Sequence, residues 1–345
     1  MHLRKVLAGT IAALISASVL GATIAANAQP GGELFRGKEI TLLIGAGAGG
    51  GADVYARTFA RHYGRHLPGN PAVVPKNMPG AGGLRVLNHI YNVAPKDGTE
   101  IALSLAGPVL EPLFGNKGAK FETQKFTWVG NMDSDATVCF TGKAAGIKTW
   151  QDLKGRETTF GASGPSSTAS IQAKVMGALL GVNVRMIHGY QGVRTSILAI
   201  QRGELDGVCG IYMSSMRAQH AREVKSSELV VWIVMDGKRI KDFPNVPTIH
   251  ELLKTDDDRK LASLIFGQNM LSRPVSAPPG LSAEVTAALR KGMTATLADA
   301  AFLEEAKKTR LHLAPMTGEE TARQLQAFYK LPAAVIGRAK TIIGR

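Results

Sequence analysis

The stretch LLIGAGAGGGADVYAR, residues 42–57, decides the fold. It opens with an apolar run typical of a buried strand, and Gly45, Gly47 and Gly50 then satisfy the spacing G-x-G-x-x-G. The residues that follow have a helical pattern. Glycine lets a ligand approach the backbone closely, and the start of a helix offers free N–H groups with partial positive charge. The stretch therefore predicts a backbone cradle for an anion.

A dinucleotide is the first candidate for that anion, and the surrounding sequence does not favour it. A dinucleotide site needs an acidic residue about 20 residues later, at the end of the second strand, to bind the ribose. After Asp53 the next acidic residue is Asp97, and the second strand, AVVPKNM at 72–78, ends in Lys and Asn. No Gly-Lys-Ser/Thr completes a phosphate-binding loop either. We therefore expect no cofactor.

The N-terminus is typical of an exported protein. Arg4 and Lys5 precede an apolar run at 6–24, and Ala-Asn-Ala at 26–28 supplies small residues where a signal peptidase cleaves. This pattern predicts a signal peptide over residues 1–28, with a membrane anchor as the alternative. No later segment has a long uninterrupted apolar run. We expect an exported protein.

Charge and metal-ligating residues narrow the class of partner. The formal net charge is +14, but the Lys and Arg residues are scattered and aromatic residues make up only 6%. This pattern favours a small anion over nucleic acid. His62 and His66 are four residues apart, yet no third ligand accompanies them, so an exposed helix face is expected and no metal site. Two cysteines alone form no zinc site, which leaves either buried thiols or a disulfide.

Strands and helices alternate along most of the chain, and a second run repeats the plan of the first. Strands are expected at 158–163, 184–190, 205–212 and 228–235, and one helix ends at Gly181. From Leu281 onward the pattern is helical, with a capping box at Thr317 and Glu320. The segment SRPVSAPPG, 272–280, is expected to be a Pro-rich connector. Alternating strands and helices predict two α/β lobes with parallel sheets.

Three further loops share the chemistry of the first. They occupy residues 78–83, 161–170 and 188–196, and each follows an expected strand. Ligands of open α/β sheets bind beyond the carboxyl ends of the strands. Two lobes with such loops predict a clamshell that closes on a small anion.

In this order and spacing the motifs resemble one family, the periplasmic solute-binding proteins of tripartite tricarboxylate transporters, also called Bug proteins. The motifs are LLIGAGAGGGAD, Pro79-Gly80-Ala81-Gly82-Gly83, PKDGTEIAL, Gly161-x-x-Gly164-x-x-Ser167, Tyr190-x-Gly192, RGELDGV and DFPNVPTIHELL. Where the family loop carries prolines before its glycines, this chain has Ala46, Gly47 and Ala48.

The resemblance implies a two-lobe type II periplasmic binding fold, each lobe a mainly parallel sheet flanked by helices, with two crossings of the chain. It places the first lobe at 29–135 plus 240–345 and the second at 136–239. It also implies a monomeric receptor, not an enzyme, that binds a small carboxylate and delivers it to the permease subunits of the membrane transporter. If the family's strand order holds, Cys139 and Cys209 lie on neighbouring strands, which makes a disulfide a hypothesis.

The resemblance also carries a set of ligand-binding residues onto this chain. In the first lobe they are Gly45, Ala46, Gly47, Ala48, Gly49, Gly50, Asp53, Ala81, Gly82, Gly83 and Ser104. In the second lobe they are Ser163, Gly164, Ser166, Ser167, Thr168, Tyr190, Gln191, Gly192 and Asp206. Asp53 has capping of its helix as a second interpretation, and Asp206 has hydrogen bonding within its own lobe.

Two alternative functions stay open. An exported hydrolase is one, because GASGP resembles a nucleophile elbow at Ser163, although the final glycine of G-x-S-x-G is missing. A binding protein that serves a sensor instead of a permease is the other.

Overall fold

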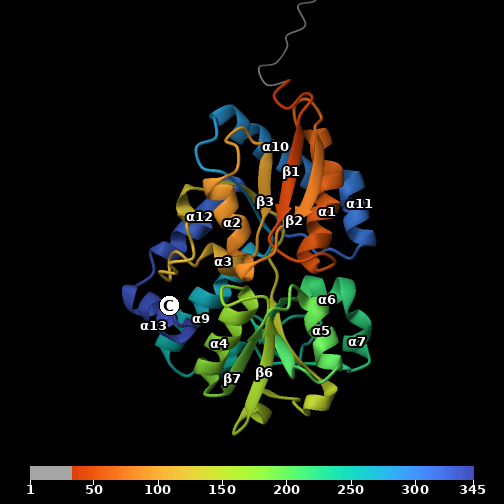
Figure 1. Cartoon of the computed structure of the whole chain (residues 1–345). Coiled ribbons are helices and arrows are strands. Elements are labelled where there is room, and N and C mark those ends of the chain that lie inside the picture. Colours follow the sequence, from red (N-terminus) through yellow and green to blue (C-terminus); the bar gives the residue numbers. More distant parts are fainter. Residues whose placement is uncertain (1–32) are drawn as a thin grey trace, which may run out of the picture.

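The computed structural model describes residues 33–345, so the expected signal peptide lies outside the described residues. The chain forms two α/β lobes stacked end to end (Figure 1). Each lobe is built on its own mixed sheet, which agrees with the expected two-lobe fold. Over residues 33–345 no helix is both long and apolar enough to cross a membrane.

The first lobe contains a six-stranded sheet with the order β11-β4-β10-β3-β1-β2. β1 pairs in parallel with β2 on one side and with β3 on the other, as the alternating pattern predicts. The elements are β1 (Glu39–Ile44), α1 (Gly51–Tyr63), β2 (Ala72–Asn77), α2 (Leu84–Asn92), β3 (Glu100–Leu103), α3 (Ala106–Val109), β4 (Thr127–Asn131), β10 (Pro274–Ala277), α10 (Ala283–Ala298), α11 (Ala300–Lys308), β11 (Met316–Thr317) and α12 (Gly318–Tyr329).

The second lobe contains a five-stranded sheet with the order β7-β6-β8-β5-β9. Figure 1 shows α4 on one side of this sheet and α5, α6 and α7 on the other. The elements are β5 (Thr137–Gly142), β6 (Glu157–Ala162), α4 (Thr168–Leu180), β7 (Asn183–His188), α5 (Val193–Gln201), β8 (Gly207–Tyr212), α6 (Met213–Gln219), α7 (Ala221–Lys225) and β9 (Leu229–Met235).

Each sheet contains an antiparallel strand that enters from the other lobe. β5 pairs antiparallel with β8 and β9, and β10 pairs antiparallel with β3 and β4. The expected connector at 272–280 is therefore wrong for Pro274–Ala277, which forms a fully buried strand. Pro274 is the first residue of this strand, a position where proline is tolerated.

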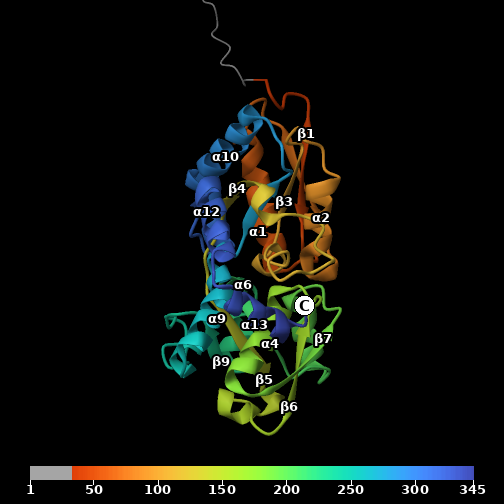
Figure 2. The ribbon, with the colours of Figure 1, turned by 90° about the vertical axis from the view of Figure 1, so that its left-hand side faces the viewer.

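The helices at the end of the chain also join the two lobes. α13 (Ala333–Ile343) packs on α9 (Asp256–Phe266) and on α4, so the chain passes toward the second lobe a third time (Figure 2). The short helix α8 (Ile249–Leu252) packs on β9. These helices belong to the range 240–345 that the sequence assigns to the first lobe, and the lobe boundaries stay a prediction.

Buried aromatic side chains hold α1 against its sheet. Tyr55, Phe59 and Tyr63 are all at most 1% exposed, as their four-residue spacing predicts. The histidines of this region do not form an exposed helix face. His62 Nε2 lies 2.5 Å from Glu305 Oε2, and His66 Nε2 lies 3.0 Å from an Asp299 oxygen, because α11 packs on α1.

A disulfide lies in the core of the second lobe. Cys139 on β5 is bonded to Cys209 on the neighbouring strand β8, and neither residue is exposed.

Further along the chain, Thr317 and Glu320 form the expected capping box of α12.

Candidate ligand-binding site

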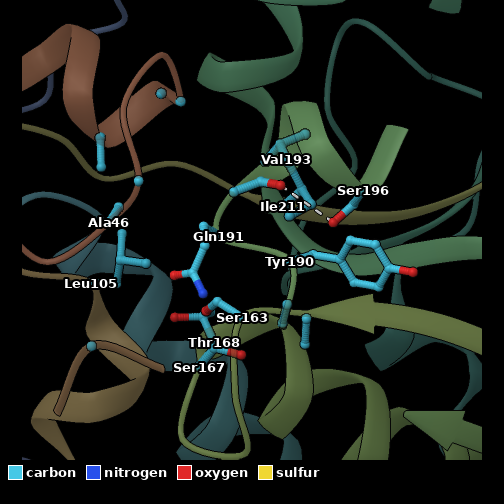
Figure 3. Close-up of a pocket in the computed structure, with 18 of the residues that line it drawn as sticks. Ala46, Leu105, Ser163, Ser167, Thr168, Tyr190, Gln191, Val193, Ser196 and Ile211 are labelled. Atoms are coloured by element: carbon cyan, nitrogen blue, oxygen red, sulfur yellow. Dashed lines mark hydrogen bonds between the residues drawn. The ribbon is translucent and has the colours of Figure 1, made fainter. Parts of the chain in front are cut away.

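A cleft lies between the two lobes, at the carboxyl ends of β1, β6 and β7. Residues from both lobes line it, as expected of a small-molecule site between two domains. Figure 3 shows Ala46 and Leu105 on one side of this cleft and Tyr190, Val193 and Ser196 on the other, with Gln191 between them.

The start of α1 forms part of the first-lobe wall. Its N-cap, Gly50, offers no side-chain hydrogen bond, and Gly51 and Ala52 line the cleft as the first residues of the helix. The first N–H groups of a helix have no partner within the helix. The cleft therefore meets free backbone donors at the positive end of a 13-residue helix.

Asp53 holds the glycine loop from behind and does not line the cleft. Its carboxylate accepts hydrogen bonds from Gly49 N at 2.9 Å, Arg57 Nε at 2.9 Å and Asn77 Nδ2 at 2.8 Å. Burial acts to raise the pKa of this carboxyl, but these hydrogen bonds outweigh it and hold the pKa below its usual range. The ionised carboxylate of Asp53 thus stabilises the conformation of the glycine loop.

Two helices of the second lobe also begin at the cleft, and they begin differently. Ser167 caps α4, since its Oγ accepts from Ser170 N at 3.3 Å. α5 begins after Gly192 and has no side-chain cap, so its first N–H groups remain free as in α1. The free starts of α1 and α5 thus approach the cleft from opposite lobes.

An arginine lies at the inner wall of the cleft. Arg273, just before β10, is 1% exposed and lines the cleft. Its guanidinium stacks between the rings of Tyr55 and Tyr212, with centroids 4.6 and 4.7 Å away. Burial raises the pKa of both phenols, so the two rings are neutral. Nη2 donates to Ser215 Oγ at 3.0 Å, and Nη1 donates to the Ser272 carbonyl at 2.7 Å.

The structure brings more than half of the residues predicted from sequence to the cleft. Those that line it are Gly45, Ala46, Gly47, Gly50, Gly83, Ser163, Ser167, Thr168, Tyr190, Gln191 and Gly192. The others, which do not, are Ala48, Gly49, Asp53, Ala81, Gly82, Ser104, Gly164, Ser166 and Asp206.

Several of these other residues have partners elsewhere. Asp206 accepts from the Thr159 N–H and hydroxyl at 2.7 and 2.8 Å, inside its own lobe. Ser166 Oγ lies 3.1 Å from Arg345 Nη2, and the same arginine holds the buried Glu111. The Asp206 carboxylate therefore stabilises its own lobe, and the Ser166 hydroxyl, which also accepts from Asn116 Nδ2 at 3.1 Å, joins the two lobes.

Sequence reasoning missed the residues that come from the strand and helix near the crossings. Arg273, Ser215, Tyr212 and Ile211 all line the cleft but belong to none of the glycine-rich loops. One signal could have found the arginine, because Arg273 is the single charged residue between Lys260 and Glu284. A lone charge within a long uncharged stretch is a candidate for a buried functional cation.

The two lobes touch across the cleft through the backbone. Gly82 lies so close to the second lobe that a Cβ atom there would be 2.5 Å from Ser167 N, and its φ of +67° also favours glycine. Hydrogen bonds between the lobes include Gly47 N to Gln191 O at 3.0 Å, Gly107 N to Thr168 Oγ1 at 3.0 Å, Gln219 Nε2 to Gly49 O at 3.1 Å and Asn116 Nδ2 to Ser166 Oγ at 3.1 Å.

Two lobes joined by crossing strands, with a cleft between them lined by helix starts, define a two-lobed ligand-binding protein. Within residues 33–345 no group of three or more His, Cys, Asp or Glu side chains is placed to hold a metal ion. The family described as tripartite tricarboxylate transporter family receptor matches residues 56–342. The chain belongs to this family.

Known relatives and solved structures are similar over most of the chain. A protein described as "UPF0065 protein in the TAR-I ttuE-ttuC' intergenic region" from Agrobacterium vitis is 24% identical over 72% of this chain and 71% of that protein. The periplasmic binding protein BugD is 20% identical over 89% of this chain and 96% of its own, with a TM-score of 0.68. Rpa4515 from R. palustris, solved with adipate, is 18% identical over 89% and 97%, with a TM-score of 0.69. These likenesses establish the fold.

Proposed function

We propose that this protein is a periplasmic receptor that binds a small organic carboxylate in the interlobe cleft and delivers it to the permease subunits of a tripartite transporter. It acts as a monomer, and it releases its ligand chemically unchanged.

One observation carries this proposal. The free helix starts of α1 and α5 and the buried guanidinium of Arg273 meet in one cleft, and no acidic side chain lines that cleft among the described residues. Helix starts and arginine both favour negative charge. A small anion fits the cleft, whereas a cation finds no charged partner in its lining.

The family supports the kind of anion and the kind of partner. Its description names a receptor of a tricarboxylate transporter, and the similar protein Rpa4515 was solved with adipate. A carboxylate is therefore favoured over a phosphate or a sulfate as the ligand. The same description supports membrane permease subunits as the partner.

A thermal-shift screen of the mature chain tests the binding step. We expect at least one acid in a panel of mono-, di- and tricarboxylates to raise the melting temperature by mass action. The amide of each acid serves as the matched neutral control and should give no shift. A panel without any shift, or equal shifts from acid and amide, would overturn carboxylate binding.

A second experiment tests delivery. Vesicles that contain the permease subunits should take up an acid from the first screen only when the protein is added. Recovery of the acid unchanged is expected after long incubation with the protein alone. Uptake without the protein would favour a sensor role, and conversion of the acid would favour the hydrolase.

A further inference from the structure

Arg273 is a buried cation without an acidic partner. It is 1% exposed, and among the described residues no carboxylate oxygen lies within 4.0 Å of its side-chain nitrogen atoms. The carboxylate of Asp133 instead accepts a hydrogen bond from the hydroxyl of Tyr55, and the ring of Tyr55 covers the guanidinium. A buried charge is unfavourable unless it is paired and hydrogen-bonded.

The guanidinium of Arg273 has N–H donors that no hydrogen bond within the described residues uses. It carries five N–H groups, and its two hydrogen bonds, to Ser215 Oγ and to the Ser272 carbonyl, occupy two of them. The buried Nε has no hydrogen-bond partner. The stacking of Tyr55 and Tyr212 holds the plane of the group fixed. Such a prearranged fork matches the two oxygen atoms of one carboxylate.

The rest of the lining offers no second full charge. Arg273 is the one charged residue among the described residues that line the cleft. Two of the hydroxyl groups already donate inside the protein, Ser167 Oγ to the Gly164 carbonyl at 2.7 Å and Ser196 Oγ to the Gly192 carbonyl at 3.3 Å. Much of the remaining surface is apolar, and it comes from Ala46, Leu105, Ala162, Val193, Val208 and Ile211.

We propose that Arg273 binds the carboxylate of the ligand and that the preferred ligand is a monocarboxylate with an uncharged, apolar body. This inference rests on the proposed function, carboxylate binding, and narrows it to one class of acid. The free N–H groups at the starts of α1 and α5 carry only partial charge, so a second carboxylate would leave water without a full cation to receive it.

A matched pair of acids tests the ligand class. Hexanoate and adipate have the same six-carbon chain and differ by one carboxylate. Titration calorimetry should give at least tenfold tighter binding for hexanoate, and benzoate should also bind more tightly than adipate. Equal or tighter binding of adipate would overturn this inference and leave the proposed function intact. The absence of binding by any mono-, di- or tricarboxylate would overturn both.

Substitution of the arginine tests the anchor. We expect Arg273→Gln to weaken hexanoate binding at least 30-fold, because truncating one partner of a buried charge pair has effects of this size. Arg273→Lys keeps the charge but loses the fork, so an intermediate loss is expected. Arg222→Gln is the matched control, since Arg222 is exposed on α7 away from the cleft, and it should change affinity less than twofold.

The melting temperature of each variant without ligand separates binding from folding. A folded Arg273→Gln protein with unchanged hexanoate affinity would overturn the proposal. If that variant does not fold, Ser215→Ala replaces it, because this change removes only the hydroxyl that positions Nη2. A severalfold loss of affinity supports the anchor, and an unchanged affinity contradicts it.

Discussion

The two lobes line the cleft with different chemical groups. Apart from Arg273, which directly precedes β10, the first lobe contributes only residues without a polar side chain: Gly45, Ala46, Gly47, Gly50, Gly51, Ala52, Pro79, Gly80, Gly83 and Leu105. The second lobe contributes hydroxyl and amide side chains, which include Ser163, Ser167, Thr168, Tyr190, Gln191 and Ser196. The first lobe therefore acts through backbone N–H groups and a single guanidinium, and the second lobe through varied side chains.

This difference separates two tasks. Backbone donors at a helix start hold an anion of any kind. Side chains of varied size and polarity decide which body can accompany that anion. Substitutions in the first lobe should therefore act on closure and anion binding, and substitutions in the second lobe on the choice of ligand.

Removal of the disulfide should have the largest effect and should be confined to the second lobe. A disulfide typically contributes about 2–4 kcal/mol to stability, and this one spans 70 residues. We expect the double substitution Cys139→Ala and Cys209→Ala to speed hydrogen exchange in β5–β9 and to leave the exchange of β1–β3 unchanged.

Alkylation under denaturing conditions is the control for this prediction. Without reductant neither cysteine should take up label, and after reduction both should. Label on both cysteines without reductant would refute the disulfide. An equal rise in exchange in both lobes would refute its confinement to one lobe.

A side chain at Gly51 should act on closure. A Cβ atom there would lie 2.0 Å from Oγ and 2.8 Å from Cβ of Ser215, which belongs to α6 of the second lobe. Overpacking of this kind costs about 1–3 kcal/mol, so we expect Gly51→Ala to weaken carboxylate binding about 5- to 150-fold. Gly237→Ala is the control, since nothing lies within 4 Å of that position. Unchanged affinity in Gly51→Ala would show that the ligand does not need the closed cleft.

Removing the side-chain cap of α4, or adding one to α1, should have a smaller effect. Ser167→Ala removes the cap of α4 and should lower stability by about 1 kcal/mol, a few degrees in melting temperature. Gly50→Ser gives α1 the side-chain cap that it lacks, and its φ of −84° accepts any residue. We expect Gly50→Ser to weaken carboxylate binding severalfold at unchanged melting temperature, because the new hydroxyl occupies N–H groups. Tighter binding would contradict the role of free donors at α1.

The smallest effect should be a pH dependence in the first lobe. His312 Nδ1 lies 2.7 Å from Asp133 Oδ1, and this hydrogen bond raises the pKa of His312 against the opposing effect of burial. A raised pKa in the folded state stabilises the protein fully below the unfolded pKa of 6.5, and the contribution is lost as the pH rises through the folded value.

Melting temperatures of wild type and His312→Gln check this pH dependence. The wild type should exceed the variant at about pH 5.5, and the difference should shrink as the pH rises to about 9. The difference between wild type and variant should also appear in the hydrogen exchange of the first lobe and not in that of the second lobe. If the melting temperatures of wild type and variant differ by the same amount at both pH values, protonation of His312 is excluded as the cause.

The sequence predicts much of the fold because the strands and glycine loops carry local signals. The apolar run before Gly45 became β1, and Gly181 ends α4 with a φ of +64°. The antiparallel strand at Pro274–Ala277 has no such signal, since the prolines in and after it indicate a connector and its partners lie in β3 and β4, far away in sequence.

The candidate site could be predicted only where it is local. Gly47 and Ser167 belong to loops with recognisable motifs, and both line the cleft. Arg273 and Ser215 come together only after the chain has crossed between the lobes, and no spacing in the sequence links them. Asp206 was predicted because it lies within the family motif RGELDGV, but its carboxylate accepts hydrogen bonds from Thr159.

The bare backbone of the first-lobe wall has a consequence for how such receptors diversify. A substitution changes a side chain, and among the ordinary residues only proline deletes the N–H group itself. Apart from Arg273, the first-lobe half of the site is therefore insulated from most point mutations, while the second-lobe half changes with every exchange of Ser163, Tyr190 or Gln191. A lineage that keeps Arg273 and this backbone wall can change the acid that it recognises and still bind the carboxylate.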